Sequence, residues 1–457
     1  MSHNKLVPKQ TVEVAVTGLG STGEGVGKVD GFTVFAHGGL PGEIVKVRLD
    51  SVKKTYAMGE VTSIIKVSPD RCEPVCPIYE QCGGCQLQHL SYAAQLKIKT
   101  QQVEDALLRI GHLKRVEVIP TLRAENPLFY RNKMQFPVAH AEGKLEIGCF
   151  AAYTHKVVDV DNCFIQKEKN NMIISVVRNW MQQYHIPAYN EDKGTGIIRH
   201  VMGRVGVHTG DVMAVLVTTT YDVPHLKELT KMLRDNVPGL KSFIQNINKR
   251  HTNVIMGQKD RVVYGKSTIR DTLGNLKFNI SAQSFFQVNS EQAEKLYNKA
   301  VEFAGLTGKE TVFDVYCGTG TISLYLAKHA KAVYGIEIVP PAIMDARRNA
   351  EDNHCDNATF LLGDAALKLP ELLEQGIKPD VVILDPPRAG CEERVLSSIV
   401  HVKPKRIVYV SCNPSTLARD LAYLSQHGYE VLVVQPVDMF PQTAHVECVA
   451  LIERKKP

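Results

Sequence analysis

The stretch FDVYCGTGTISL, residues 313–324, decides the fold of the second half of this 457-residue chain. An apolar strand runs into a Gly-rich turn, and the turn opens a helix. Glycines let a backbone approach a ligand closely, and the start of a helix favours negative charge. The spacing around Gly318 and Gly320 is not G-x-G-x-x-G, so it carries no dinucleotide fingerprint. The pattern predicts a cofactor loop, with NAD binding as the competing interpretation.

Outward from this loop, apolar strands alternate with helical segments from about residue 281 to the C-terminus. The helical segments include residues 290–305, 340–352 and 415–428. This alternation is typical of a doubly wound α/β sheet with right-handed crossovers. We therefore predict a Rossmann-like domain over residues 281–457. The expected strands are TVFDVYCG, AVYGIEI, ATFLLGD, DVVILDPP, RIVYVSC, EVLVVQPV and, at the end of the chain, ECVALIER.

Four polar residues lie where strands of this domain begin or end. Glu337 ends the strand after the cofactor loop, where a carboxylate can accept hydrogen bonds from ribose hydroxyls. Asp385 follows the apolar VVIL, and Cys412 follows IVYV just before a helix, whose start is expected to stabilise a thiolate. Glu447 precedes the last apolar run and is a candidate general base beside a thiol. The alternatives are an inert packing role for Cys412 and a solvated surface position for Glu447.

Two further regions precede this domain. Residues 1–66 contain short alternating strands with Gly-rich turns, which predicts an OB-like β-barrel. Lys46, Arg48, Lys53 and Lys54 form a basic cluster there, suited to RNA or to the protection of a strand edge. Residues 67–280 combine a Cys-rich loop, a helix over 91–111 and strand-like segments, which predicts a central α+β domain.

Composition sets outer bounds on the function. Apolar residues make up 44% of the chain and charged residues 22%, which excludes a largely disordered protein. The net charge of +6 permits a nucleic-acid partner without requiring one. The opening MSHNKLVPKQ lacks the apolar region of a signal peptide, and no run of about 18 apolar residues occurs. We expect a cytoplasmic protein without a membrane span.

Eleven cysteines are unusual for such a chain, because a reducing compartment disfavours structural disulfides. Cys76, Cys82 and Cys85 are spaced C-x5-C-x2-C, which indicates a metal site. Cys72 adds a fourth nearby thiol, so a self-contained zinc site of four cysteines is one interpretation.

Together the motifs resemble the RumA/TrmA family of RNA uracil-5-methyltransferases. The resemblance covers the whole catalytic half in order, and residues 1–66 look like a TRAM domain, an OB-like RNA-binding module. The barrel and the Cys-rich loop resemble the rRNA-modifying branch more than the tRNA-modifying branch, which typically lacks both. The resemblance of the catalytic half to the family lies in the segments SFFQVNSEQAEKLY, FDVYCGTGTISL, YGIEIVPPAI, VILDPPRAGCE, VYVSCNPSTLARDL and FPQTAHVECVALIER.

The resemblance implies a class I methyltransferase fold and methylation of uracil C5 from S-adenosylmethionine (SAM). It implies that Cys412 adds to uracil C6 and that Glu447 removes the C5 proton. Phe285 is a candidate to stack on an extruded uracil or, alternatively, a core aromatic; Arg131 and Lys133 are candidate RNA contacts or ordinary surface charges. The implied SAM contacts are Gln287, Tyr316, Glu337 and Asp385.

The resemblance also implies a [4Fe–4S] cluster on Cys76, Cys82, Cys85 and the distant Cys163, an interpretation we prefer to zinc. The expected partner is RNA, with 23S rRNA as the first candidate and tRNA as the alternative. A non-catalytic RNA-binding factor for ribosome assembly is a further alternative, which the combination of Cys412, Glu447 and Asp385 disfavours. No obligate protein partner is expected.

Overall fold

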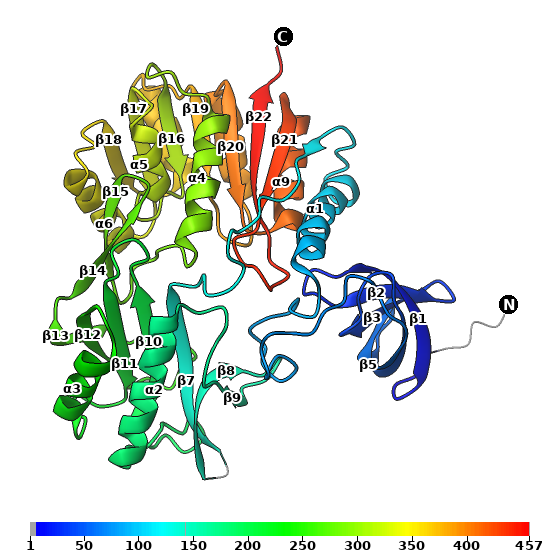
Figure 1. Cartoon of the computed structure of the whole chain (residues 1–457). Helices are drawn as coiled ribbons and strands as arrows, with labels where there is room; N and C mark the ends of the chain where they lie inside the picture. The colour runs from blue at the N-terminus through cyan, green and yellow to red at the C-terminus, as the bar shows by residue number, and fades with distance from the viewer. Residues whose placement is uncertain (1–5, 142, 457) are drawn as a thin grey trace.

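The protein is described here from a computed structural model, over residues 6–141 and 143–456. Residues 1–5, 142 and 457, which the predicted domain ranges include, lie outside the described part. Three bodies are visible: a barrel, a central sheet with two helices, and a larger sheet flanked by helices (Figure 1). No helix in the described ranges is long and apolar enough to cross a membrane.

The N-terminal body is a closed five-stranded barrel, as the sequence predicts. Its interior is filled by every second residue of each strand, for example Val12, Val14 and Val16 of the first strand. Lys46 and Arg48 point outward between buried neighbours, so the predicted basic cluster is exposed. The strands, in barrel order, are β1 (Thr11–Leu19), β2 (Gly25–Val29), β3 (Phe32–His37), β5 (Tyr56–Lys66) and β4 (Ile44–Val52).

The central body is a seven-stranded sheet whose core lies under two helices. Helices α2 (Glu168–Gln183) and α3 (Leu226–Asn236) lie against this sheet (Figure 1). Their apolar faces bury Trp180 and Leu229 in the core between them and the sheet. The strands, in sheet order, are β13 (Lys259–Gly265), β12 (Leu240–Ile247), β11 (Val212–Thr218), β10 (Ile198–Val205), β7 (Lys133–Ala141), β8 (Lys144–Phe150) and β9 (Val157–Asp159).

The C-terminal body is an α/β sheet of eight strands, and all seven strands predicted from the sequence are present. In sheet order the strands are β18 (Ala358–Leu362), β17 (Ala332–Glu337), β16 (Thr311–Val315), β19 (Val381–Leu384), β20 (Arg406–Ser411), β22 (Glu447–Arg454), β21 (Tyr429–Val437) and β6 (Glu117–Val118). The helices that cover it are α4 (Ser290–Ala304), α5 (Thr321–Ala327), α6 (Pro340–Asp352), α7 (Ala365–Glu374), α8 (Glu393–Val402) and α9 (Pro414–Gln426).

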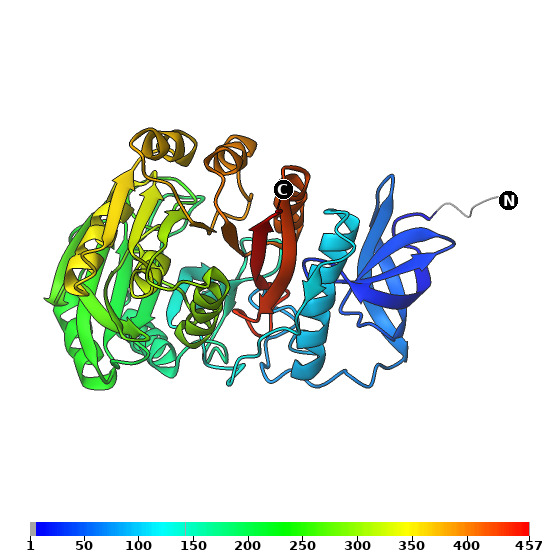
Figure 2. The same cartoon turned by 90° about the horizontal axis from the view of Figure 1, so that it is seen from above.

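Two pieces of the predicted central region pack on this C-terminal sheet instead. Helix α1 (Tyr92–Arg109) buries Val103 and Leu107 in the core beneath α9, and β6 pairs with β21. In both overall views α1 lies between the barrel and the C-terminal sheet (Figures 1 and 2). The domain boundaries at 66/67 and 280/281 stay predictions, but α1 links the barrel side of the molecule to the C-terminal body.

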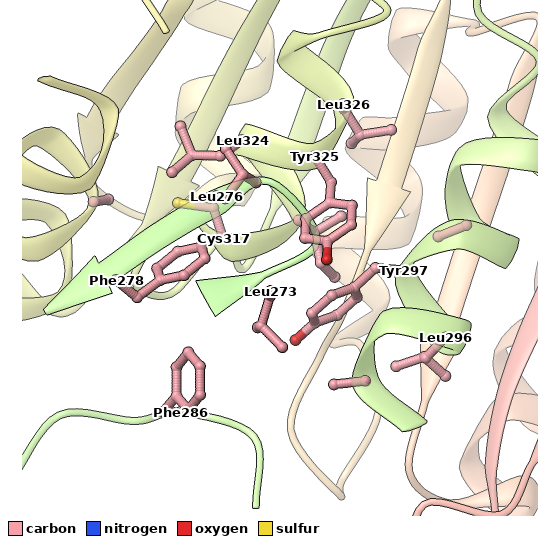
Figure 3. Close-up of a cluster of buried hydrophobic side chains, with 14 of the residues drawn as sticks. Leu273, Leu276, Phe278, Phe286, Leu296, Tyr297, Cys317, Leu324, Tyr325 and Leu326 are labelled. Atoms are coloured by element: carbon pink, nitrogen blue, oxygen red, sulfur yellow. The ribbon is translucent and has the colours of Figure 1, made fainter. Parts of the chain in front are cut away.

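The hairpin of β14 (Thr268–Leu273) and β15 (Leu276–Ser281) also joins the C-terminal core. Its Leu273 and Phe278 lie with Cys317 and Leu324 around the base of the Gly-rich loop (Figure 3). The hairpin therefore supports the underside of the predicted cofactor loop.

Candidate active site

The predicted catalytic residues meet at one edge of the C-terminal sheet because of strand direction. Strands β16, β17, β19 and β20 run parallel, so the residues that follow them share the carboxyl edge. Strand β22 is antiparallel to β20, with Ser411 opposite Cys448. The next residue along β20 is Cys412, and the preceding residue of β22 is Glu447, so the register brings the two side by side.

Glu447 lies in a cluster of buried carboxyl groups. Its side chain is buried, and burial followed by the nearby charge of Asp385 raises the pKa of Glu447 to about 8. Burial and the charge of Asp314 raise the pKa of Asp385 to about 7. At neutral pH such groups exchange protons readily, which is the property a general base needs.

The Cys412 thiol is half-buried beside these carboxyl groups. Burial, then the charges of Glu447 and Asp385, raise the pKa of Cys412, while Arg388 opposes them. The start of α9 was expected to favour the thiolate, but burial and the two carboxyl groups outweigh that effect. The thiol is therefore protonated at neutral pH in this state, and it lies beside carboxyl groups of raised pKa.

The Gly-rich loop has the backbone that its sequence predicts. Tyr316 and Gly320 both adopt positive φ, of 69° and 81°, and a Cβ on Gly320 would lie 2.8 Å from the ring of Phe360. Glu337 holds the loop in place, because its carboxylate accepts from the N–H of Gly318 at 3.1 Å and of Val339 at 2.9 Å. Tyr316 and Glu337 thus lie at the same edge as Asp385.

Gln287 lies on the segment that enters α4 and is linked to the same carboxyl groups through Tyr297. Its carbonyl accepts from the side-chain amide of Asn132 at 2.9 Å, and its side chain bonds the phenol of Tyr297. Burial and the charges of Asp385 and Glu447 raise the pKa of Tyr297. Tyr297 stands beside Leu273 in the core below the site (Figure 3). No role was predicted for Tyr297, since a tyrosine on an amphipathic helix has no distinguishing local signal.

Of the predicted RNA contacts, Phe285 is exposed, whereas Arg131 and Lys133 are half-buried and line the cysteine cavity described below. Phe285 has 69% of its surface exposed, so it is not a core aromatic. The Arg131 guanidinium lies 6.0 Å from the centre of the Phe440 ring, and that ring is 6.1 Å from His445. Burial and the charges of Arg204 and Arg131 lower the pKa of Lys133 to about 8.

The cysteine cluster forms a separate cavity of about 400 Å³. Cys76, Cys82, Cys85 and Cys163 all line it, and so does Cys149, for which no role was predicted. Cys72 is not among the lining residues; its thiol contacts the carbonyl of Gln88 at 3.5 Å. A hydrogen bond from Cys149 lowers the pKa of Cys82 to about 7.

Within residues 6–141 and 143–456, no group of three or more His, Cys, Asp or Glu side chains is arranged to hold a metal ion. A single zinc ion needs its thiolates about 2.3 Å away. A [4Fe–4S] cluster is held by four thiolates spread around its own volume. The cavity brings five cysteines together without such an arrangement around a single ion.

Comparison with known proteins identifies the family. The family model described as tRNA (uracil-5-)-methyltransferase matches residues 91–455, and the TRAM domain matches residues 7–62. The chain belongs to the uracil-5-methyltransferase family. These matches confirm three predictions: the resemblance to the RNA uracil-5-methyltransferases, the α/β fold with a TRAM barrel, and the assignment as a methyltransferase.

Relatives of this uracil-5-methyltransferase align over nearly the whole chain. An uncharacterized RNA methyltransferase of Clostridium acetobutylicum is 51% identical over 97% of this chain and 96% of its own. One of Halalkalibacterium halodurans is 50% identical over 97% of both chains. The crystal structure of Pyrococcus abyssi tRNA (uracil-54, C5)-methyltransferase with S-adenosyl-L-homocysteine is 30% identical, with a TM-score of 0.77 over 96% of this chain and all of that one.

Proposed function

We propose that this methyltransferase transfers a methyl group from SAM to C5 of a uridine in RNA, with Cys412 as nucleophile and Glu447 as general base. The observation that carries the proposal is the β20–β22 register, which puts a thiol beside a carboxyl group whose pKa is about 8. Uracil C5 is too weak a nucleophile to take a methyl group directly. A thiol that adds to C6 and a base that acts at C5 are the two groups needed.

The steps use these two side chains and Asp385. Cys412 gives its proton to the carboxylate of Asp385, whose pKa is about 7, and the thiolate adds to C6, which makes C5 an enolate-like nucleophile. C5 takes the methyl group and keeps its hydrogen. The ionised form of Glu447 then removes that proton, the C5–C6 double bond reforms, and Cys412 leaves as a thiolate that takes its proton back from Asp385. The raised pKa of Glu447 supplies driving force for proton removal.

The residues proposed to hold SAM are Gln287, Tyr316, Glu337 and Asp385. SAM supplies the electrophilic methyl group. The Gly-rich loop fits it, because a Cβ at Gly318 would meet no atom within 4 Å, and Glu337 holds the loop backbone through the N–H of Gly318. Asp385 lies next to both Glu447 and the loop, which suits a contact shared by the methyl donor and the uracil.

The proposed substrate is 23S rRNA, which rests on the resemblance to the rRNA-modifying branch and on the TRAM barrel with its exposed Lys46 and Arg48. A tRNA uridine is the second candidate. The Pyrococcus abyssi enzyme, whose name states a tRNA substrate, aligns with 96% of this chain, so domain content alone does not separate the two.

A map of 5-methyluridine in rRNA and tRNA from cells with and without the gene tests the substrate. Loss at 23S sites supports the first candidate, and loss only in tRNA supports the second.

The chemistry is tested with 5-fluorouridine transcripts, since fluorine cannot be removed as a proton and the covalent adduct persists. Wild type should form a denaturation-resistant complex, and Cys412→Ala should form none. A complex with Cys412→Ala would overturn the role of this thiol, and RNA binding without any adduct would favour the assembly-factor alternative.

We further propose that Cys76, Cys82, Cys85 and Cys163 hold a [4Fe–4S] cluster. The cavity that these four line supports the proposal, and the position of Cys72 outside it disfavours the four-cysteine zinc site. Such a cluster would tie the Cys-rich loop to Cys163 between β9 and α2, a structural role. Iron and sulfide analysis of anaerobically purified protein tests it, and stoichiometric zinc without iron would reverse the assignment.

A further inference from the structure

The segment that leads into Glu447 is held by several distant parts of the chain. This segment, residues 438–446, joins β21 to β22 and is here named the base loop. Its backbone carbonyls accept hydrogen bonds from α4 and from the central body. The donors are Gln292 to Asp438 at 3.0 Å, Asn289 to Met439 at 3.1 Å, and Tyr130 to Pro441 at 3.0 Å.

Helix α1 adds two contacts through one side chain, and the first of them is a buried ion pair. The Lys99 ammonium lies 2.5 Å from a carboxylate oxygen of Asp438 and 3.1 Å from the carbonyl of Phe440, and both Lys99 and Asp438 are buried. A buried ion pair is a poor source of net stability, because desolvation offsets most of the attraction. The ion pair instead restricts geometry, because the buried charges stay paired only when the base loop keeps one position relative to α1.

One turn earlier on α1, Gln95 pairs with Gln442 through both ends of its amide. Gln95 accepts from the Gln442 N–H and donates to its side-chain oxygen, each at 3.0 Å. Gln442 has φ of 70°, a left-handed conformation that a residue with a side chain adopts only when its surroundings hold it. Its carbonyl accepts from the N–H groups of Gln86 and Leu87, next to Cys85.

The geometry points to Lys99 and Gln95 as positioning residues for the general base: they fix the base loop so that Glu447 meets the C5 proton. Neither residue touches the site itself; both act through the loop, which ends one residue before Glu447. Because Gln442 also bonds the Cys-rich loop, α1 and that loop together set where β22 begins. This inference rests on the proposed function.

The test separates proton removal from the earlier steps. Lys99→Met and Gln95→Met are compared with wild type on unmodified 23S rRNA and tRNA transcripts, with radiolabelled SAM. A misplaced base leaves Cys412 addition and methylation intact but slows release. We expect turnover to fall about 100-fold, the usual effect of a displacement near 1 Å. A labelled, denaturation-resistant complex should then accumulate on ordinary uridine, while the rate of 5-fluorouridine adduct formation stays near that of wild type.

Two further variants keep the test decisive. Arg109→Met removes an exposed ion pair with Asp105 at the end of the same helix and should behave as wild type. Lys99→Met/Asp438→Leu replaces the buried pair by apolar groups, which preserves folding when the single variant does not. Equal slowing of the 5-fluorouridine adduct and of turnover, or wild-type turnover, would overturn the inference. Absence of any adduct with the wild-type protein would overturn the proposed function instead.

Discussion

Replacing Glu447 by Gln should stabilise the protein at alkaline pH while abolishing turnover. Gln keeps the size of the side chain and removes its titration. Burial and Asp385 raise the pKa of Glu447 from 4.5 to about 8, so folding favours its protonated form. The stability from this carboxyl is complete below pH 4.5 and is lost as the pH rises toward 8.

The size of the effect follows from the two pKa values. One pKa unit corresponds to about 1.36 kcal/mol. At pH 7 the unfolded chain has an ionised Glu447 and the folded chain a largely protonated one, a difference that disfavours folding by about 3 kcal/mol. At pH 5 the destabilisation caused by Glu447 is below about 1 kcal/mol. Glu447→Gln lacks this destabilisation, so its free energy of unfolding relative to wild type should rise by about 2–3 kcal/mol from pH 5 to pH 7.

Urea unfolding followed by circular dichroism at pH 5, 6, 7 and 8 measures this difference. Glu430→Gln is the matched control, because Glu430 is an exposed carboxylate on the adjacent β21. Its difference from wild type should be flat across the range. If the Glu447→Gln difference is equally flat, Glu447 is ionised in the folded protein, and the argument for a base of raised pKa fails.

Three further predictions concern other parts of the site. Arg388→Met should raise the pKa of Cys412, because the Arg388 guanidinium is the charge that opposes the effect of burial on this thiol. The alkaline rise of the pH–rate profile should then move to higher pH, and Arg388→Lys should return the profile to that of wild type. Phe285→Ala should leave the melting temperature unchanged, since the ring is 69% exposed, but should raise the KM for RNA by about 5- to 150-fold if the ring stacks on a base; an unchanged KM would exclude stacking. Cys163→Ser should lose iron on anaerobic purification, whereas Cys72→Ser, outside the cavity, should retain it; iron loss from both would reject the assigned ligand set.

The C-terminal sheet was predictable because its signals are local. Apolar runs such as VVIL and IVYV are too short for helices, and the segments between them have helical periodicity. The attachment of α1 and β6 to that sheet was not predictable. Glu117 pairs with Val433 across more than 300 residues of chain, and neither residue type specifies a partner. Long-range contacts of this kind decide which body a segment joins.

The environment of Cys412 was only half predictable, for a similar reason. Its place between a strand and a helix is local, and from that place a lowered pKa was expected. The groups that raise the pKa, Glu447 and Asp385, come from other strands, so their influence depends on sheet order. Cys149 shows the same limit: it looks like an ordinary strand residue of β8 until the fold puts it in the cysteine cavity.

The antiparallel direction of β22 is what makes one site out of two distant motifs. If β22 ran parallel to β20, its first residue would lie at the amino edge of the sheet, at the opposite end from Cys412. Inserted antiparallel between β20 and β21, it begins at the carboxyl edge, and Glu447 arrives beside the thiol. The base loop must therefore return the chain at that edge, where it meets α1. Lys99 and Gln95 contact the base loop at the point where it reverses the chain direction. The reversal that brings Glu447 beside Cys412 therefore also brings the base loop into contact with α1, which can then position the base.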